Sequence, residues 1–66
     1  MTHIFNLCYK AKIKGDIVPV KDTVEVKTEY GRTTAEWLAK RNFRSINIDA
    51  RQAKESEIEV LNYSTK

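Results

Sequence analysis

Residues 3–14, HIFNLCYKAKIK, alternate between apolar and polar side chains along their length. A period of two is typical of a β-strand, in which successive side chains point to opposite faces, so this segment is predicted to be a half-buried strand. The face predicted to be buried carries Phe5, Leu7, Tyr9, Ala11 and Ile13. The opposite face carries Asn6, Cys8, Lys10, Lys12 and Lys14.

A second strand is predicted at residues 23–30. Gly15-Asp16 breaks the first pattern, as turn residues do. Pro19 follows, and proline is restricted to loops, strand starts or sheet edges. We therefore expect an antiparallel hairpin with a loose loop around residues 15–22. One face of the predicted second strand carries Val24, Val26, Thr28 and Tyr30.

A helix is predicted after Gly31, which ends the hairpin. The run Thr33-Thr34-Ala35-Glu36 matches a capping box, in which the first threonine accepts a hydrogen bond from the backbone near Glu36 and the Glu36 side chain reaches back. The helix is expected to continue to about Asn42, because asparagine is a common left-handed terminator.

The C-terminal third allows two interpretations. Residues 44–50 alternate again and predict a third strand, whose apolar side carries Ile46, Ile48 and Ala50. Residues 56–63, SEIEVLNY, fit a further strand, yet residues 49–61 are also rich in helix formers, with Asp49 available as a cap. A hairpin with a polar connection at about residues 51–56 is favoured. The predicted fold is then α+β in two layers, with an antiparallel sheet of about four strands covered by one helix, in the order strand-strand-helix-strand-strand.

The length of 66 residues predicts one small domain, residues 1–66, that buries only about 60% of its unfolded surface. Cys8 is the only cysteine, so no disulfide can form within the chain. Cys8 and the single histidine, His3, cannot supply the four ligands of a structural zinc site. No cofactor is expected, and homodimerisation or a bound partner is the remaining route to extra stability.

The surface is expected to be mixed in charge with a basic bias, because 12 basic and 9 acidic residues give a net charge of +3. This bias permits a nucleic acid or an acidic protein as partner. An unpaired cysteine, the lack of a signal peptide and the lack of a membrane-spanning apolar run predict a cytoplasmic protein without a membrane interaction.

One candidate binding surface surrounds Trp37, the only tryptophan. On a helix it shares a stripe with three cations, and we call this set the helix stripe: Trp37, Lys40, Arg41 and Arg44. If Ala35, Leu38 and Ala39 form the buried face, Trp37 points into water, where it can stack on a base or anchor a protein interface.

The alternative rotates the helix so that Trp37 and Leu38 both face the sheet. Trp37 is then partly buried, and the cationic stems pack over the edge of the ring. Burying a tryptophan stabilises a small core by about 3 to 5 kcal/mol, which favours this alternative.

The second candidate surface is the lysine row: Lys10, Lys12 and Lys14. On one strand face these ammonium groups are about 7 Å apart, comparable to the phosphate spacing of a nucleic-acid strand. Alternatively, the lysines protect an edge strand from aggregation. Cross-strand pairs with Glu25 and Glu29 are expected to reduce the positive charge of the row. Glu55, Glu57 and Glu59 form an acidic end that would repel a phosphate backbone if it lies beside the lysines.

No catalytic residue is predicted. His3, close to the amino terminus, is interpreted as a surface residue, and no histidine, cysteine, serine or carboxylate is spaced for catalysis. Gly15 and Gly31 stand alone, so no phosphate-binding loop is expected. Cys8 is expected to be a half-exposed strand residue beside Lys10.

These features predict a small intracellular binding module, not an enzyme, that occupies the surface of a protein partner. Two alternatives are a nucleic-acid-binding protein that uses the helix stripe and the lysine row, and a structural subunit of a homo-oligomer. In size and element order the chain resembles some small phage-encoded proteins that block bacterial defence or toxin systems by direct binding. The resemblance covers the whole length as an architecture, without a matched functional residue, and implies an inhibitor.

Overall fold

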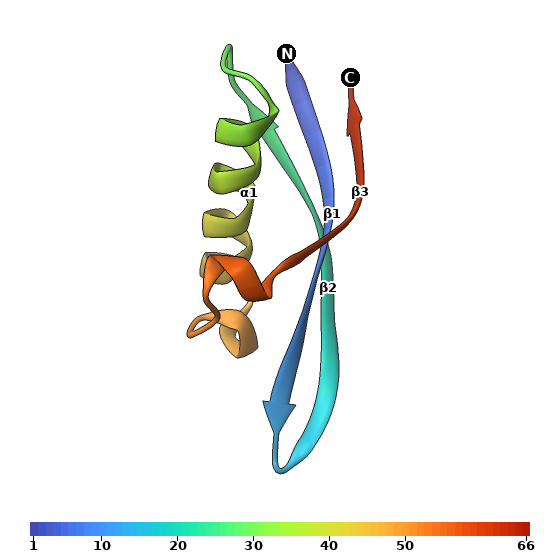
Figure 1. Cartoon of the computed structure of the whole chain (residues 1–66), viewed down its shortest axis with the longest axis vertical. Coiled ribbons are helices and arrows are strands. Elements are labelled where there is room, and N and C mark those ends of the chain that lie inside the picture. Colours follow the sequence, from blue (N-terminus) through green and yellow to red (C-terminus); the bar gives the residue numbers. More distant parts are fainter.

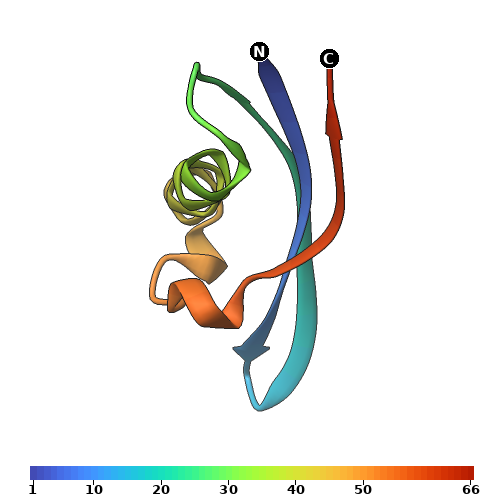
Figure 2. The same cartoon turned by 45° about the horizontal axis from the view of Figure 1, so that its top comes forward.

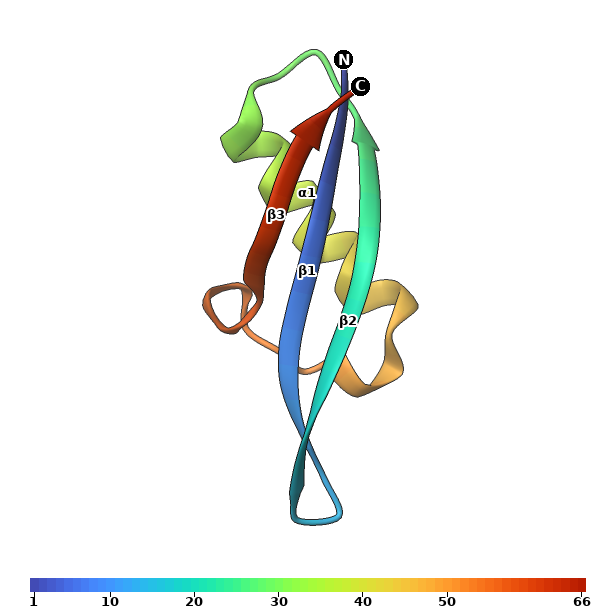
Figure 3. The same cartoon turned by 90° about the vertical axis from the view of Figure 1, so that its right-hand side faces the viewer.

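The computed structural model describes every residue from Met1 to Lys66. An antiparallel sheet carries one α-helix on one face, and the other face is open (Figure 1 and Figure 3). The predicted class, a two-layer α+β domain with a single helix, is confirmed, but the sheet has three strands and not four. The elements are β1 (Thr2–Ile13), β2 (Asp16–Lys27), α1 (Arg32–Ile46), the short 3-10 helices η1 (Ile48–Ala50) and η2 (Glu55–Glu57), and β3 (Glu59–Thr65).

The first strand forms the centre of the sheet, whose order is β2-β1-β3. β1 pairs with β2 along its full length, from Thr2 opposite Lys27 to Ile13 opposite Asp16. β3 pairs only with the first part of β1, which ends where Cys8 lies opposite Glu59. A bulge in β3, where Leu61 is the extra residue, shifts this register between Asn6 and Leu7 of β1. The predicted first strand and its buried face are therefore confirmed.

The loose loop predicted at residues 15–22 is wrong, because β2 begins at Asp16 after a two-residue turn. Lys14 (φ 51°) and Gly15 (φ 86°) both have positive φ, as a tight hairpin turn of this kind requires. Residues that flank such a turn exchange hydrogen bonds, and the pairs then alternate along the ladder. Lys10 and Pro19 therefore form a pair whose nitrogens face away from the partner strand, so proline is tolerated there.

The predicted capping box is wrong. α1 begins at Arg32 after Gly31, without a capping side chain, and Thr33 lies inside its first turn. The Glu36 carboxylate faces the cations of Arg32 and Lys40, at 3.9 and 3.5 Å, and does not reach the cap. These i,i+4 pairs stabilise the helix surface.

The helix extends past the predicted end at Asn42 and stops at Ile46. Asn47 follows with an extended backbone (φ −116°), so no left-handed terminator is used. Its side-chain amide donates to the Phe43 carbonyl oxygen at 3.0 Å and to the Asp22 carboxylate at 3.2 Å. This side chain therefore joins the end of α1 to β2.

The strand predicted at residues 44–50 does not form, because this segment contains the last turn of α1 and then η1. The C-terminal strand itself is confirmed as β3, preceded by a polar connection. It does not form a hairpin with its neighbour in sequence, since its partner is β1. The order is therefore strand-strand-helix-strand, and Figure 2 shows the connection after α1 leading to the outer edge of the sheet.

The core lies between α1 and the helix-facing side of the sheet. Phe5, Leu7 and Phe43 are completely buried at its centre. Small residues of α1, Ala35 and Ala39, let the helix backbone approach the strands closely. The whole cluster consists of Phe5, Leu7, Val24, Val26, Ala35, Ala39, Phe43, Ala50, Ala53 and Ile58.

The molecule is elongated, with extents of 40 × 17 × 17 Å. The lower half of the β1–β2 hairpin, residues 9–20, extends beyond β3 and α1, and we call it the hairpin arm (Figure 1). The protein exposes 4760 Å², whereas a compact monomer of 7.7 kDa is expected to expose about 4,300 Å². No helix is both long and apolar enough to cross a membrane.

Candidate functional site

The hairpin arm has two chemically different faces. Its helix-side face continues the core with Ala11 and the partly exposed Val18, which lies opposite Ala11 in the register. The other face carries Lys10 and Lys12, with Ile17 opposite Lys12. Ile17 is 69% exposed and Val18 is 40% exposed. The arm therefore presents apolar side chains that the fold itself does not bury.

The lysine row lies on this arm. Lys10, Lys12 and Lys14 are all exposed, and none takes part in any of the salt bridges of the structure. Neutralisation by Glu25 is not observed, because Glu25 lies opposite Ile4, far along the strand from the row. The row consists of two strand lysines and one at the turn.

A shallow depression lies where β3 leaves β1. Cys8, Tyr9 and Lys10 line it from β1, and the acidic end of the connection lines it from the other side, with Ser56, Glu57 and Glu59. Lys10 therefore has carboxylates nearby, as expected from the sequence. Lys12 and Lys14 lie farther along the arm, away from these carboxylates.

The two edges of the hairpin arm differ. On β1, odd-numbered residues direct their backbone groups at β2, since the Thr28 nitrogen donates to the Met1 carbonyl at 3.2 Å. Even-numbered residues direct theirs at β3, since the Lys66 nitrogen donates to the Thr2 carbonyl at 2.9 Å. Pairing with β3 ends at Cys8.

The backbone groups of Lys10 and Lys12 therefore face the side that β3 has left, and we call them the free β1 edge. Figure 3 shows that no strand lies beside this part of β1, although the connection with η2 comes close to its upper end, where Ser56 and Glu57 lie near Lys10. The opposite edge of the arm belongs to β2, where Pro19 has no N–H to offer.

The helix stripe is divided in the structure. Trp37 is 46% exposed and lies outside the core cluster, and the Arg41 guanidinium carbon is 5.9 Å from the centre of its ring. Lys40 is only 9% exposed, beside Glu36 on the flank nearer the sheet. Arg44 is half-buried. The rotation that turns Trp37 toward the sheet is therefore wrong, because Phe43 and the alanines already fill that face. The ring is nevertheless partly buried, and the Arg41 side chain lies over it, as this alternative expected.

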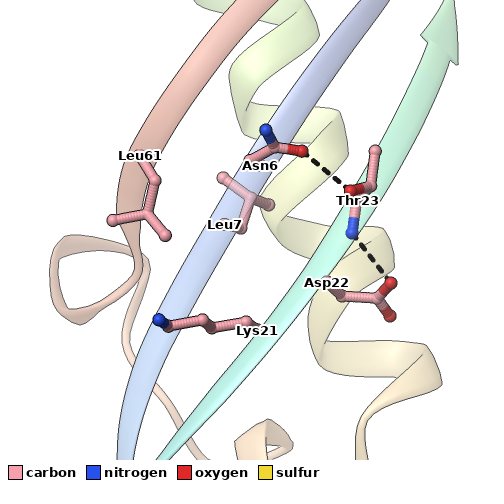
Figure 4. Close-up of a pocket in the computed structure, with 6 residues that line it drawn as sticks. All are labelled: Asn6, Leu7, Lys21, Asp22, Thr23 and Leu61. Atoms are coloured by element: carbon pink, nitrogen blue, oxygen red, sulfur yellow. Dashed lines mark hydrogen bonds between the residues drawn. The ribbon is translucent and has the colours of Figure 1, made fainter.

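The open face of the sheet carries a polar depression that the sequence did not reveal (Figure 4). Thr23 donates from its hydroxyl to the Asn6 side-chain oxygen at 2.7 Å. The Lys21 side chain extends across β1, toward Leu61 of the bulged β3 strand. Alternation predicted that Asn6 faces away from the core, but only the strand register brings Thr23 and Leu61 beside it.

His3 is a core residue, so its interpretation as a surface residue is wrong. It is 2% exposed, and its Nδ1 is hydrogen-bonded to the Tyr63 hydroxyl at 2.7 Å. Its Nε2 has no partner. Phe5 and Tyr63 surround the ring, and the Arg32 guanidinium covers Tyr63 at 4.4 Å. The sequence could have indicated this burial, because His3 is on the same, odd-numbered face of β1 as the buried Phe5.

Cys8 is also more buried than expected, with 5% of its surface exposed. It lies between Lys21 and Glu59, its neighbours on the two adjacent strands. No group of three or more histidine, cysteine, aspartate or glutamate side chains is arranged to hold a metal ion.

Comparison with known proteins gives no match: no family model fits the chain, and no curated protein or solved structure is significantly similar to it. Function therefore has to be inferred from the geometry of the arm, the helix and the open sheet face.

Proposed function

We propose that the protein is a small non-enzymatic binding module that occupies a surface of a protein partner through its hairpin arm. The observation that carries this proposal is the arm itself. Its residues Ile17 and Val18 are apolar and exposed. The domain buries few residues, so it would be expected to use such side chains in its core. Neighbouring exposed apolar side chains are favourably removed from water when another molecule covers them, so they suit an interaction surface.

The positions of the two most reactive side-chain types support binding over catalysis. The imidazole of His3 is enclosed by Phe5 and Tyr63, and only 5% of the Cys8 surface is exposed. A catalytic group must come within hydrogen-bond reach of its substrate, and both of these side chains are almost completely buried.

A protein partner fits the arm better than a nucleic acid does. Two aliphatic side chains lie among the lysines of the arm, and Glu57 and Glu59 lie beside Lys10. Aliphatic side chains gain nothing from a phosphate backbone, whereas a mixed protein surface offers partners to both the aliphatic and the charged side chains of the arm. Such a contact can block the partner, as the resemblance to small phage-encoded inhibitors suggests, although that resemblance now rests on size and class alone.

The test is a matched pair of exposed positions. Ile17 (69% exposed) lies on the arm, and Tyr30 (70% exposed) lies in the loop at the opposite end of the molecule. Immobilised protein is used to capture a partner from cells of its source, the captured protein is purified, and affinity is measured by calorimetry. We expect Ile17→Ser with Val18→Ser to weaken binding at least about tenfold, because interface anchors contribute this much.

The control Tyr30→Ser is expected to change the affinity less than about twofold. The arm variant is expected to fold, because neither Ile17 nor Val18 belongs to the core cluster. Circular dichroism checks that it does. A purified partner that binds both variants equally, or the absence of any reconstituted complex, contradicts the proposal.

A second candidate function is nucleic-acid binding through the helix stripe, favoured by the exposure of Trp37 beside Arg41. Stacking on a base would quench Trp37 emission, and affinity would fall steeply with salt. Titration with single-stranded and duplex oligonucleotides tests this candidate. Emission that no oligonucleotide changes, at low or physiological salt, rejects it.

A further inference from the structure

We infer that the free β1 edge of the hairpin arm binds an extended segment of the protein partner, in which acidic and apolar residues alternate. This inference rests on the proposed function and specifies the contact. The segment would take the place beside β1 that β3 leaves after Cys8, and so would lengthen the sheet by strand addition.

The backbone geometry supplies the binding groups. Lys10 and Lys12 each offer one N–H and one C=O on the same side, and no strand of this chain pairs with them there. Both residues are held extended by continuous pairing with β2, where they lie opposite Pro19 and Ile17. The edge is therefore preorganised, which lowers the entropic cost of binding.

The opposite edge of the arm is a poorer template. The Pro19 nitrogen faces outward there and carries no hydrogen, so a strand added to β2 would lose one donor. On β3, the Tyr63 nitrogen already donates to the Asn62 side-chain oxygen at 2.9 Å. The free β1 edge of the arm has no such interruption.

The side chains at this edge specify the chemistry of the segment. On the face away from the helix, an added strand meets the exposed lysines Lys10 and Lys12. On the helix-side face it meets the half-buried Tyr9 and Ile13. Cross-strand neighbours of opposite charge attract, so an acidic residue suits the position beside Lys12, and apolar residues suit the second face. Lys10 already has Glu57 and Glu59 nearby, so the position beside Lys10 attracts an acidic residue less strongly.

A second copy of this chain is a poor occupant. Two free β1 edges that paired with each other would bring lysines of one copy beside lysines of the other. Like charges on neighbouring strands are destabilising. A segment with acidic residues at alternate positions avoids this repulsion.

The probe is a synthetic peptide of alternating glutamate and valine, roughly six residues long, which is a common strand length. Nuclear magnetic resonance of the whole protein follows each backbone amide during titration. We expect slower hydrogen exchange at the Lys10 and Lys12 amides, and binding that weakens with salt. The same peptide N-methylated at alternate residues, and a lysine-valine peptide, are expected not to bind.

Two variants separate the backbone contact from charge. Lys12→Gln removes the charge and keeps the N–H, whereas Lys12→Pro also removes the outward N–H without touching the hydrogen bonds to β2. We expect Lys12→Pro to bind the peptide about twofold to tenfold more weakly than Lys12→Gln, the range for one hydrogen bond. Lys27→Gln, at the far end of β2, is the control for net charge and is expected to leave affinity unchanged.

Three results would overturn the inference: binding without protection of the Lys10 and Lys12 amides, equal binding of the N-methylated peptide, or protection of β2 amides instead. Tighter binding of an oligonucleotide at the same lysines would also overturn it and would favour nucleic acid. If the peptide fails while a purified partner still depends on Ile17 and Val18, the proposed function stands and only the strand contact is rejected. If both tests fail, both proposals are rejected.

Discussion

The hydrogen bond between His3 and Tyr63 allows a quantitative prediction for Tyr63→Phe. The His3 ring is 2% exposed, its Nδ1 is bonded to the Tyr63 hydroxyl at 2.7 Å, and its Nε2 has no partner. Removal of the hydroxyl leaves both ring nitrogens without a protein partner. A newly unsatisfied buried polar group costs about 1 to 3 kcal/mol.

That cost is large for this protein. A chain of 66 residues is expected to have an unfolding free energy of roughly 3 to 10 kcal/mol. Each kcal/mol shifts the melting temperature of a domain this small by about 4 to 8 °C. We therefore expect Tyr63→Phe to lower the melting temperature by at least about 4 °C.

A double-mutant cycle tests the cause. His3→Phe removes the imidazole, so the Tyr63 hydroxyl then has no buried partner to satisfy, and Tyr63→Phe in that background should cost less than about 0.5 kcal/mol. Urea unfolding followed by circular dichroism measures all four variants. The control is Tyr9→Phe, because the half-buried Tyr9 makes no side-chain hydrogen bond and its loss should cost under about 0.5 kcal/mol.

The reasoning is refuted if Tyr63→Phe lowers the free energy of unfolding by the same amount with and without His3. It is also refuted if Tyr9→Phe is as destabilising as Tyr63→Phe, because the cost would then reflect the loss of any tyrosine hydroxyl. A change in the urea dependence of the unfolding free energy would indicate an altered denatured state.

Three further perturbations test the fold. Phe43→Ala, at a completely buried position, should cost about 3 to 5 kcal/mol and leave the protein largely unfolded on warming, and a thermal melt within a few degrees of wild type would contradict the described core. Asn47→Ala should cost about 1 to 2 kcal/mol in urea unfolding, because it removes the bonds to Asp22 and to the Phe43 carbonyl, and no change would mean that this link is not formed. Gly15→Ala should cost about 1 to 2 kcal/mol, since φ is +86° and no atom lies within 4 Å of the added carbon, so an unchanged melting temperature would place the turn in another conformation.

The candidate site was only partly predictable from the sequence. Alternation identified the exposed lysine row correctly, because Lys10 and Lys12 share a parity that local geometry alone decides. It did not identify Ile17 and Val18, since Pro19 broke the pattern and suggested a loop. Nor did it identify the free β1 edge, which depends on where β3 stops pairing.

The rotation of the helix was not predictable for a related reason. The spacing of Trp37, Lys40 and Arg41 is fixed by helix geometry, but the rotation of the helix about its axis depends on which side chains best fill the space above the sheet. Phe43 and two alanines fill it. Lys40 therefore lies beside Glu36 near the sheet, and Trp37 remains on the outer side.

By itself, the sequence determined β1 and its buried face, the presence of one helix after Gly31 and the strand character of the last residues, because these depend on periodicities of two and 3.6 within one segment. The tertiary structure decided the length of β2, the number of strands and the partner of β3. Asp22 shows why: it faces the helix side at a position where alternation demands an apolar residue, and it is satisfied there by Asn47, distant in sequence. Pairings between distant residues leave no local period, so only the assembled sheet and helix could select them.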